Sequence, residues 1–246
     1  MASTLYLIPT PLGAIGEHPG LLADSLPTTA IAAIQPLTYF IVENSKSARA
    51  FLKAIATQTP LQALELRELN EHTPEAAIKD LLQPLLDGQD AGLLSDAGCP
   101  AIADPGAPLV RLAHQHGIRV RPLVGPSSLV LSLMGSGLIG QRFAFHGYLP
   151  SKPEARRNAL RELEQRSERD DAAQIFIETP YRNGAMLETL QSACRPDTWC
   201  TVACDLTLTT EWIHTRRMKD LMNPLPDLNK RPCVFILYRQ GRTCPH

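Results

Sequence analysis

The sequence predicts an α/β protein of two domains, with a mostly parallel sheet in the N-terminal domain and a mixed sheet in the C-terminal domain. Its 246 residues exceed the usual size of a single domain. Short apolar runs alternate with helical patterns in the first half, which is typical of βαβ units, and this alternation changes after Gly125 and Pro126. We therefore expect an N-terminal α/β domain of residues 1–123 and a C-terminal α/β domain of residues 124–246.

The N-terminal domain is expected to alternate strands with covering helices. Apolar residues recur at helical spacing at Ala48, Phe51, Leu52 and Ile55, and residues 75–86 repeat this pattern. The expected strands are residues 5–8, 39–42, 92–95 and 118–123, and the expected helices are residues 47–55 and 75–86. This order favours a parallel sheet with helices packed on it.

The C-terminal domain is expected to combine helices with a second set of strands. A serine opens the apolar helix at residues 127–134, and the next helix, residues 154–169, is highly charged. The expected third helix is residues 183–193, and the expected strands are residues 174–178, 201–206, 212–215 and 233–238. Residues 211–217 are typical of one arm of a hairpin, which predicts antiparallel pairing in this sheet.

Composition limits the classes of function. The chain has 24 basic and 25 acidic residues and a formal net charge of -1, so any polyanion must meet a local basic patch. No apolar run reaches the roughly 18 residues of a spanning helix. Residues 1–10 lack the features of a signal peptide, which predicts a cytoplasmic protein. The six cysteines form no CxxC pair, so we expect neither a metal site nor a disulfide.

Five segments rich in Gly, Pro, Ser and Asp follow predicted strands, at the carboxyl ends where open α/β sheets bind ligands. They are residues 9–13, 95–100, 104–106, 125–128 and 178–182. Within the loop of residues 95–106, Gly98 permits close approach of a ligand and Asp96 offers an acceptor. The loop therefore predicts a small polar ligand with an amino acid or ribose part. The sequence contains no GxxxxGK[ST] or GxSxG motif, and no GxGxxG motif follows the first expected strand, so the sequence does not support a triphosphate site, a dinucleotide site or a serine nucleophile.

The most specific signal is a set of motifs in a fixed order. They are LYLIPTPLG, GLLSDAGCPAIADPG, PLVGPSS, SGL, FHGYLPSKPEARR and IETPYR. With these motifs, residues 5–238 resemble the tetrapyrrole-methylase superfamily of S-adenosylmethionine-dependent methyltransferases. The nearest branch is that of the small-subunit ribosomal RNA methyltransferase I, which methylates a ribose 2′-hydroxyl of cytidine. The resemblance implies a two-domain tetrapyrrole-methylase-like fold, a homodimer, RNA or the ribosomal subunit as partner, and S-adenosylmethionine in a cleft between the domains.

The resemblance also implies positions for the cofactor site. Pro11 would lie at the floor of the cleft, and the cofactor loop would be lined by Asp96, Ala97, Gly98 and Ile102. Further expected contacts are Ser127 and Ser128 at its border, and the weaker contacts Leu149, Thr179 and Pro180 from the second domain.

Methyl transfer to a hydroxyl needs a base, and the expected catalytic residues are Glu43 and Lys152. Lys152 is alternatively a phosphate contact. The expected substrate-binding residues are Arg156, Arg157, Tyr181 and Arg182. His146 is interpreted either as a proton shuttle or as a hydrogen-bonded packing group.

The sequence departs from the ribosomal branch in the first loop and again just after the second expected strand. Residues 13–15 are Gly-Ala-Ile, where that branch usually has Gly-Asn-Leu, and Asn44 stands where it has an acid. Four hypotheses therefore stay open. RNA methylation leads, followed by methylation of a tetrapyrrole or another small molecule, methylation of a protein, and S-adenosylmethionine binding without turnover.

Overall fold

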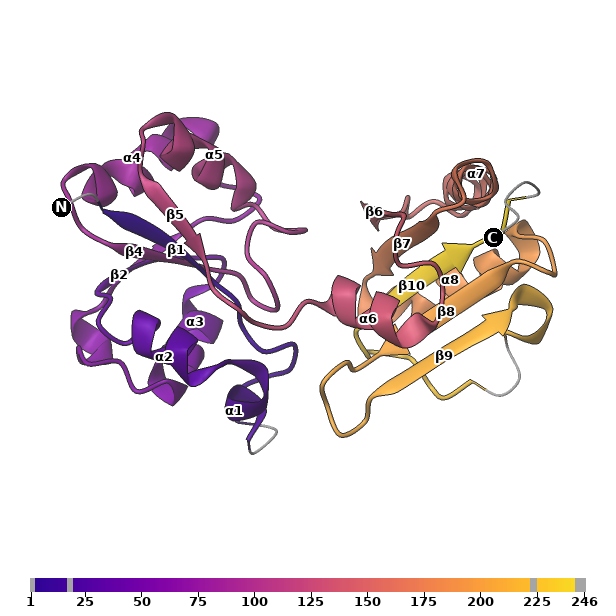
Figure 1. The fold of residues 1–246 in the computed structure, drawn as a ribbon, viewed down its shortest axis with the longest axis horizontal. Helices are drawn as coiled ribbons and strands as arrows, with labels where there is room; N and C mark the ends of the chain where they lie inside the picture. Colours follow the sequence, from indigo (N-terminus) through magenta and orange to yellow (C-terminus); the bar gives the residue numbers. More distant parts are fainter. Residues whose placement is uncertain (1–2, 17–19, 222–224, 242–246) are drawn as a thin grey trace. The chain divides into compact units, whose positions relative to one another are not determined.

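The structure, a computed structural model, describes residues 3–16, 20–221 and 225–241 (Figure 1). The chain divides into two units, and the division falls between Ser127 and Ser128. The sequence predicts a boundary between residues 123 and 124, just before Gly125 and Pro126. In the structure residues 124–127 continue the first unit as the loop that follows its last strand.

The first unit contains a parallel sheet with the strand order β3-β2-β4-β1-β5. Its strands are β1 (Thr4–Ile8), β2 (Tyr39–Val42), β3 (Glu65–Glu68), β4 (Ala91–Leu94) and β5 (Arg119–Pro122). The predicted parallel N-terminal sheet is therefore confirmed. The sequence analysis missed β3, whose residues Glu-Leu-Arg-Glu lie at the edge of the sheet and carry no apolar run.

Helices cover both faces of this sheet (Figure 1). One face carries α1 (Leu21–Ser25), α2 (Thr28–Ile34) and α3 (Ser45–Ala54), and the other carries α4 (Glu75–Leu86) and α5 (Ala107–Gln115). A short 3-10 helix, η1 (Leu61–Ala63), precedes β3. Alternate residues of β2 face opposite sides: Phe40 and Val42 pack with α3, whereas Tyr39 and Ile41 pack with α4 and α5. Burial on both faces explains why the central strands are continuous apolar runs.

The second unit contains a mixed sheet with the order β6-β7-β10-β8-β9. Its strands are β6 (Phe143–Tyr148), β7 (Ala173–Glu178), β8 (Trp199–Cys204), β9 (Trp212–Arg217) and β10 (Cys233–Tyr238). β6 pairs with β7 in parallel, and the other pairs are antiparallel, as predicted. The sequence analysis missed β6, an edge strand that is irregular between Phe145 and Tyr148.

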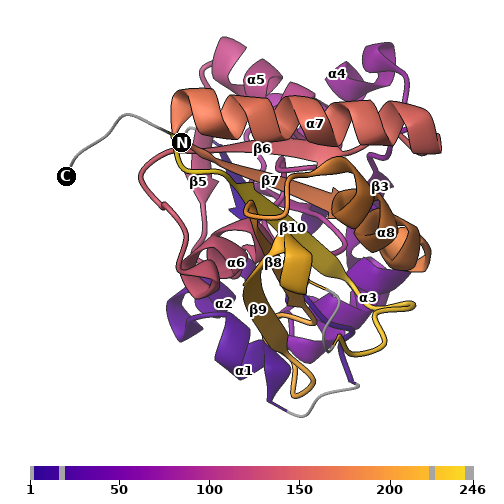
Figure 2. The same ribbon diagram turned by 90° about the vertical axis from the view of Figure 1, so that its right-hand side faces the viewer.

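Helices also cover both faces of the second sheet. α7 (Pro153–Asp170) and α8 (Asn183–Ala193) lie together on one face, over a core that includes Phe176 and Phe235 (Figure 2). α6 (Ser128–Ser136) packs on the opposite face against β8, β9 and β10. The remaining 3-10 helices are η2 (Pro180–Arg182) and η3 (Met218–Asp220).

The five cysteines that the structure describes are free thiols, and Cys244 lies outside the described residues. Within the described ranges, no three His, Cys, Asp or Glu side chains form a group that could hold a metal ion. None of the helices in that part of the chain is both long enough and apolar enough to cross a membrane.

Candidate cofactor and active site

The loops that follow β1 and β4 meet at the carboxyl edge of the first sheet. The Thr10 amide donates to the Gly98 carbonyl at 2.9 Å, and the Gly98 amide donates to the Thr10 carbonyl at 3.0 Å. The Thr10 hydroxyl also donates to the Ser95 carbonyl at 3.2 Å. Two of the five loops that the sequence predicts to carry a ligand are thus tied to each other.

A cavity of about 290 Å³ opens beside this junction, between the loops and the start of α3. Pro11, Asn44, Ser47 and Asp96 are among the residues that line it. Pro11 and Asp96 are predicted cofactor residues from different loops, and the fold places them at one cavity. Open α/β sheets bind ligands at this edge, so we take the cavity as the candidate site.

Ser47 and Glu43 hold Asp96 in place. The Ser47 hydroxyl donates to Asp96 Oδ1 at 2.5 Å, and the Asp96 amide donates to Glu43 Oε2 at 2.9 Å. The Asn44 side chain caps α3 by accepting from the amides of Lys46 and Ser47. These contacts leave Oδ2 of Asp96 without a partner among the described residues. A bound ligand can therefore donate to it.

The environment of Glu43 changes its acidity. Burial is the largest cause and raises its pKa above that of an ordinary glutamate, while the hydrogen bond from the Asp96 amide opposes the change. The negative charges of Asp96, Asp104 and Glu71 raise the pKa further. The ionised Glu43 carboxylate is consequently a stronger proton acceptor than a solvent-exposed one.

Residues 95–106 form a loop with three left-handed positions. Gly98, Ala101 and Ala103 have φ angles of 76°, 65° and 61°. Non-glycine residues in this conformation cost about 1–3 kcal/mol each and persist only where surrounding contacts fix them. Asp104 supplies such contacts, because its Oδ1 accepts from the Ala101 amide at 2.8 Å and from the Gly106 amide at 2.7 Å. Burial raises the pKa of Asp104.

The loop after β5 packs against the same group of loops. A Cβ atom added to Gly125 would lie 2.3 Å from the Pro9 Cβ, and the Cys99 thiol donates to the Pro126 carbonyl at 3.3 Å. Ser127, a predicted cofactor residue, ends this loop and is half-buried. Ile102, predicted for the same site, lies in the loop of residues 95–106 and is half-exposed. Ser128, also predicted, begins α6 in the second unit.

In the second unit, a buried carboxylate organises the loop after β7. Glu178 Oε1 accepts from the Thr179 amide at 2.7 Å and from Arg182 Nε at 2.9 Å, and it forms an ion pair with Arg182 Nη2. Thr179 and Pro180 are half-buried, whereas the Tyr181 side chain is 76% exposed. The contacts of Glu178 therefore fix the backbone of this loop, while the Tyr181 side chain points into solvent.

The predicted residues near the start of α7 differ in their exposure to solvent. Lys152 and Arg157 are exposed, but Arg156 is only 4% exposed. Its guanidinium donates to Thr189 Oγ1 at 3.0 Å and to two backbone carbonyls. Arg156 therefore packs α7 against α8, and we no longer assign it to the substrate.

Two further predicted residues lie inside the second unit. Leu149 belongs to the buried apolar core beneath α7 and α8. His146 Nε2 lies 2.7 Å from Gln174 Oε1, a hydrogen-bond distance that matches the interpretation of His146 as a packing group.

Comparison with known proteins identifies the family, although no protein-family model matches the chain. The chain is 32% identical over 239 residues to the ribosomal RNA small subunit methyltransferase I of Xylella fastidiosa. This similarity covers 97% of the chain and 81% of the relative. The chain belongs to the ribosomal RNA small subunit methyltransferase I family. It is accordingly a methyltransferase, and the resemblance drawn from the motifs is confirmed.

Solved structures agree with this family in fold. The methyltransferase CobJ matches with a TM-score of 0.60 and 17% identity over 96% of this chain and 93% of its own. Uroporphyrin-III C-methyl transferase from Thermus thermophilus, complexed with S-adenyl homocysteine, matches with a TM-score of 0.58 and 15% identity. That match covers 96% of this chain and 98% of the other. At these identities the likeness shows the fold, which confirms the predicted tetrapyrrole-methylase-like architecture.

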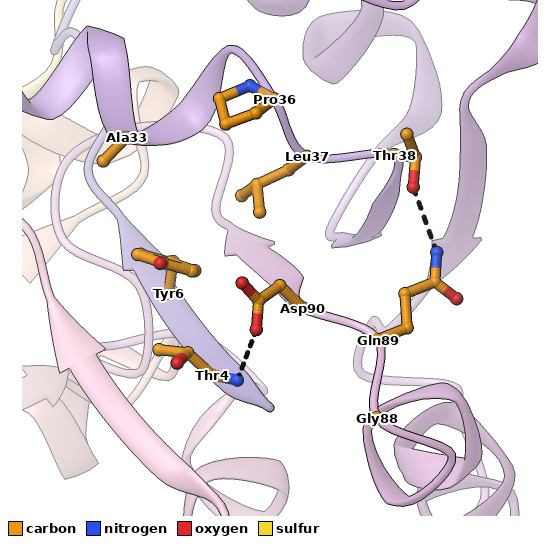
Figure 3. Close-up of a pocket in the computed structure, with 9 residues that line it drawn as sticks. All are labelled: Thr4, Tyr6, Ala33, Pro36, Leu37, Thr38, Gly88, Gln89 and Asp90. Carbon is orange, nitrogen blue, oxygen red and sulfur yellow. Dashed lines mark hydrogen bonds between the residues drawn. The ribbon is translucent and has the colours of Figure 1, made fainter. Parts of the chain in front are cut away.

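A second cavity of the methyltransferase lies at the opposite, amino edge of the first sheet (Figure 3). It measures about 370 Å³. Asp90 faces Thr4 there and accepts from its amide at 2.7 Å, while Gln89 donates to Thr38. None of the predicted site residues lines this cavity. Its carboxylate, Asp90, already accepts a hydrogen bond from the backbone of β1.

Sequence reasoning missed two residues of the candidate site. From the sequence, Ser47 was predicted only to begin a helix and Asp104 only to belong to a turn, and neither was predicted as a site residue. The Asn44-Ser-Lys-Ser47 segment did carry a helix-capping signal, which places Ser47 in the first turn of α3. No local signal indicates that Ser47 reaches Asp96, because the contact joins residues 49 positions apart.

Proposed function

We propose that the chain transfers a methyl group from S-adenosylmethionine to a ribose 2′-hydroxyl of small-subunit ribosomal RNA. The observation that carries the proposal is the 32% identity to a ribosomal RNA small subunit methyltransferase I over nearly the whole chain. The architecture of the carboxyl edge in the first unit supports it, because that edge offers a cavity beside backbone and carboxylate groups.

The residues at this edge fit the chemistry of the donor. Asp96 Oδ2 has no partner in the described part of the chain and can accept from a hydroxyl or an ammonium group. The loop at Ala97, Gly98 and Ile102 is fixed before binding by Asp104, so little entropy is lost when a ligand contacts it. Pro11 lines the same cavity. Further proposed donor contacts are Ser127, Ser128, Leu149, Thr179 and Pro180.

The donor supplies a methyl group on a positively charged sulfur. In the transfer, the carbon–sulfur bond breaks as the new carbon–oxygen bond forms, and sulfur leaves as a neutral thioether. The hydroxyl proton must go to a base. This chain's residues hold the partners in line, exclude water and accept that proton.

Glu43 is the proposed base. Its raised pKa makes the ionised carboxylate a better proton acceptor, and only Oε2 is used by the Asp96 amide. Lys152 precedes α7 and is exposed, so we propose that it binds phosphate beside Arg157. Tyr181 is proposed to contact a base of the RNA, and Arg182 to hold the loop that presents it.

The proposal extends to the setting of the reaction. Ribosomal RNA as acceptor implies that the protein meets the small ribosomal subunit or its RNA in the cytoplasm. The free thiols of the described residues are compatible with that reducing compartment. We also propose a homodimer, which light scattering on the purified protein would test through the molar mass.

The direct test offers several acceptors to the purified protein together with methyl-labelled S-adenosylmethionine. Small ribosomal subunits, free ribosomal RNA, total protein and a low-mass extract are incubated separately. Nuclease digestion and mass spectrometry are expected to locate the label in a 2′-O-methyl nucleoside. Label that appears only in protein or in low-mass compounds would overturn the RNA proposal, and no transfer to any acceptor would contradict turnover.

A further inference from the structure

The second sheet has an end that the proposed reaction does not use. β6, β7 and β8 begin there, while β9 and β10 end there, because the register pairs Phe143 with Ala173 and Trp199 with both Arg217 and Tyr238. The loop of Thr179 follows the other end of β7. Two cavities of about 620 and 400 Å³ open at the unused end, and Gln141 lines both.

The larger cavity has aromatic walls. Trp199 and Tyr238 line it together with Thr215 and residues 137–141. The guanidinium of Arg217 lies 3.9 Å from the centre of the Trp199 ring but does not line the cavity. The indole therefore carries a cation on one side and presents another part of its surface to the cavity. Tyr238 is oriented by donating its hydroxyl to Asp171 Oδ1 at 2.7 Å.

The loop at the rim of this cavity supplies free donors. The backbone amides of Ile139, Gly140 and Gln141 donate to no protein acceptor within the ranges that the structure describes. Nucleobases and phosphates both carry acceptors for such amides. A planar group that enters the cavity can thus stack on an aromatic ring and be hydrogen-bonded at its edge.

The smaller cavity is lined by three exposed arginines and by Asp170, which is the ion-pair partner of one of them. The side chains of Arg142, Arg166 and Arg169 are 52%, 45% and 71% exposed. Each forms an ion pair with an acid, and these acids are Asp171, Glu162 and Asp170 respectively. The pairs of Arg166 and Arg169 are exposed on both sides and contribute only about 0–1 kcal/mol, so a phosphate can replace their carboxylates at little cost. Asp171 is only 16% exposed, so Arg142 keeps this partner and offers a phosphate the exposed part of its guanidinium.

We propose that this end of the second sheet binds single-stranded RNA. An unpaired base stacks in the cavity of Trp199 and Tyr238, and flanking phosphates pair with Arg142, Arg166 and Arg169. An aromatic platform beside cationic side chains is the combination by which proteins hold unpaired strands. The inference rests on the proposed function in taking RNA as the substrate, and it adds an anchoring surface at the sheet end opposite the Thr179 loop.

Fluorescence tests the base cavity directly. Trp199 is the sole tryptophan in a Trp212→Phe protein, and a cytidine-rich RNA of about 12 nucleotides is expected to quench it on stacking. In the matched Trp199→Phe protein, Trp212 is the sole tryptophan, and its fluorescence is expected to stay unchanged when the RNA is added. Bound RNA that leaves Trp199 emission unaltered would overturn the base cavity.

Affinity measurements separate stacking from a structural effect. Fluorescence anisotropy of the labelled RNA is expected to show binding about 5- to 100-fold weaker for Trp199→Leu, since one base stack is lost. Trp199→Phe keeps an aromatic ring and is expected to bind nearly as the parent protein does. Circular dichroism checks that both variants fold, and equal binding by the leucine and phenylalanine proteins would contradict stacking.

Charge reversal tests the phosphate contacts. Arg166→Glu combined with Arg169→Glu is expected to weaken RNA binding. The slope of the logarithm of the binding constant against the logarithm of the salt concentration is expected to become shallower by about 0.7 per lost phosphate contact. The matched control reverses Arg111 and Arg119, two exposed arginines of the first unit. If both double variants lose the same affinity, the effect is general charge and the proposed surface is wrong.

Methyl transfer distinguishes the two proposals. If the parent protein methylates no RNA, the proposed function fails. If it methylates RNA while the Trp199→Leu and arginine variants bind and methylate RNA as the parent does, the anchoring surface fails and the function stands. The inference predicts a raised KM for RNA with little change in kcat.

Discussion

The loops after β4 and β7 both follow buried strands, but they are fixed in different ways. In the first loop, Glu43 and Asp104 accept from backbone amides, which leaves one oxygen of Asp96 available at a cavity. In the second, Glu178 is paired with the Arg182 side chain, and Tyr181 projects outward. The first arrangement shapes a backbone site for a small ligand, whereas the second fixes a platform from which a side chain can reach a large substrate.

The largest effect is expected when the proposed base is removed from the first loop. Glu43→Gln keeps an oxygen that accepts from the Asp96 amide, so donor affinity should persist while kcat falls about 10²- to 10⁴-fold. Glu43→Ala should lower both. In the parent enzyme, activity should fall as the pH drops through the raised pKa of Glu43, because the base becomes protonated. Equal loss of donor affinity in both variants would leave Glu43 with a positioning role only.

In the second loop, the expected effect is on stability. Arg182→Ala leaves the fully buried Glu178 charge unpaired and should lower the free energy of unfolding by about 2–3 kcal/mol. This value lies below that of a fully buried pair because the Arg182 side chain is partly exposed. Adding Glu178→Gln removes the charge and should restore part of the loss in urea unfolding. A double variant less stable than Arg182→Ala would contradict this account.

A substitution at Gly98 tests whether the first loop must keep its backbone conformation. Gly98→Val places a branched side chain at a φ of 76° and a Cβ 3.3 Å from Leu12, so donor affinity should fall about 30-fold or more. Gly184→Val, where an added Cβ meets nothing within 4 Å, is the matched control. Isothermal titration with S-adenosylmethionine measures both, and unchanged affinity of Gly98→Val would exclude close backbone contact.

The smallest expected effect concerns the residue that shapes the first loop from within. Asp104→Ala frees the amides of Ala101 and Gly106 and should weaken donor binding about 10-fold. Asp104→Asn keeps the oxygen that accepts both bonds and should bind nearly as the parent protein. If titration gives the same affinity for the two variants, the loop does not depend on these hydrogen bonds.

The strands that are buried on both faces are predicted well from the sequence. β2 and β4 are continuous apolar runs between helices, whereas the edge strand β3 has two glutamates and an arginine and was missed. Three helices of the first unit were missed as well, namely the short α1 and α2 and the nine-residue α5. A buried strand can be recognised from its apolar composition. A polar edge strand cannot, because it forms by pairing with a neighbouring strand that is distant in the sequence.

Site residues follow a similar division. Asp96 and Gly98 were predicted as site residues because loops after buried strands carry ligands, but the contacts that orient Asp96 come from Ser47 and Glu43, far away in the sequence. Arg156 was misassigned to the substrate. Its spacing with Leu160 and Leu163 places it on the buried face of α7, so helical periodicity contained the signal for its structural role.

Hydrogen exchange with and without S-adenosylmethionine tests most directly whether the carboxyl edge of the first sheet binds the methyl donor. The account predicts that the donor slows exchange at the amides of residues 9–15 and 95–106. Slower exchange only around residues 33–38 and 88–90, at the amino-edge cavity, would contradict it.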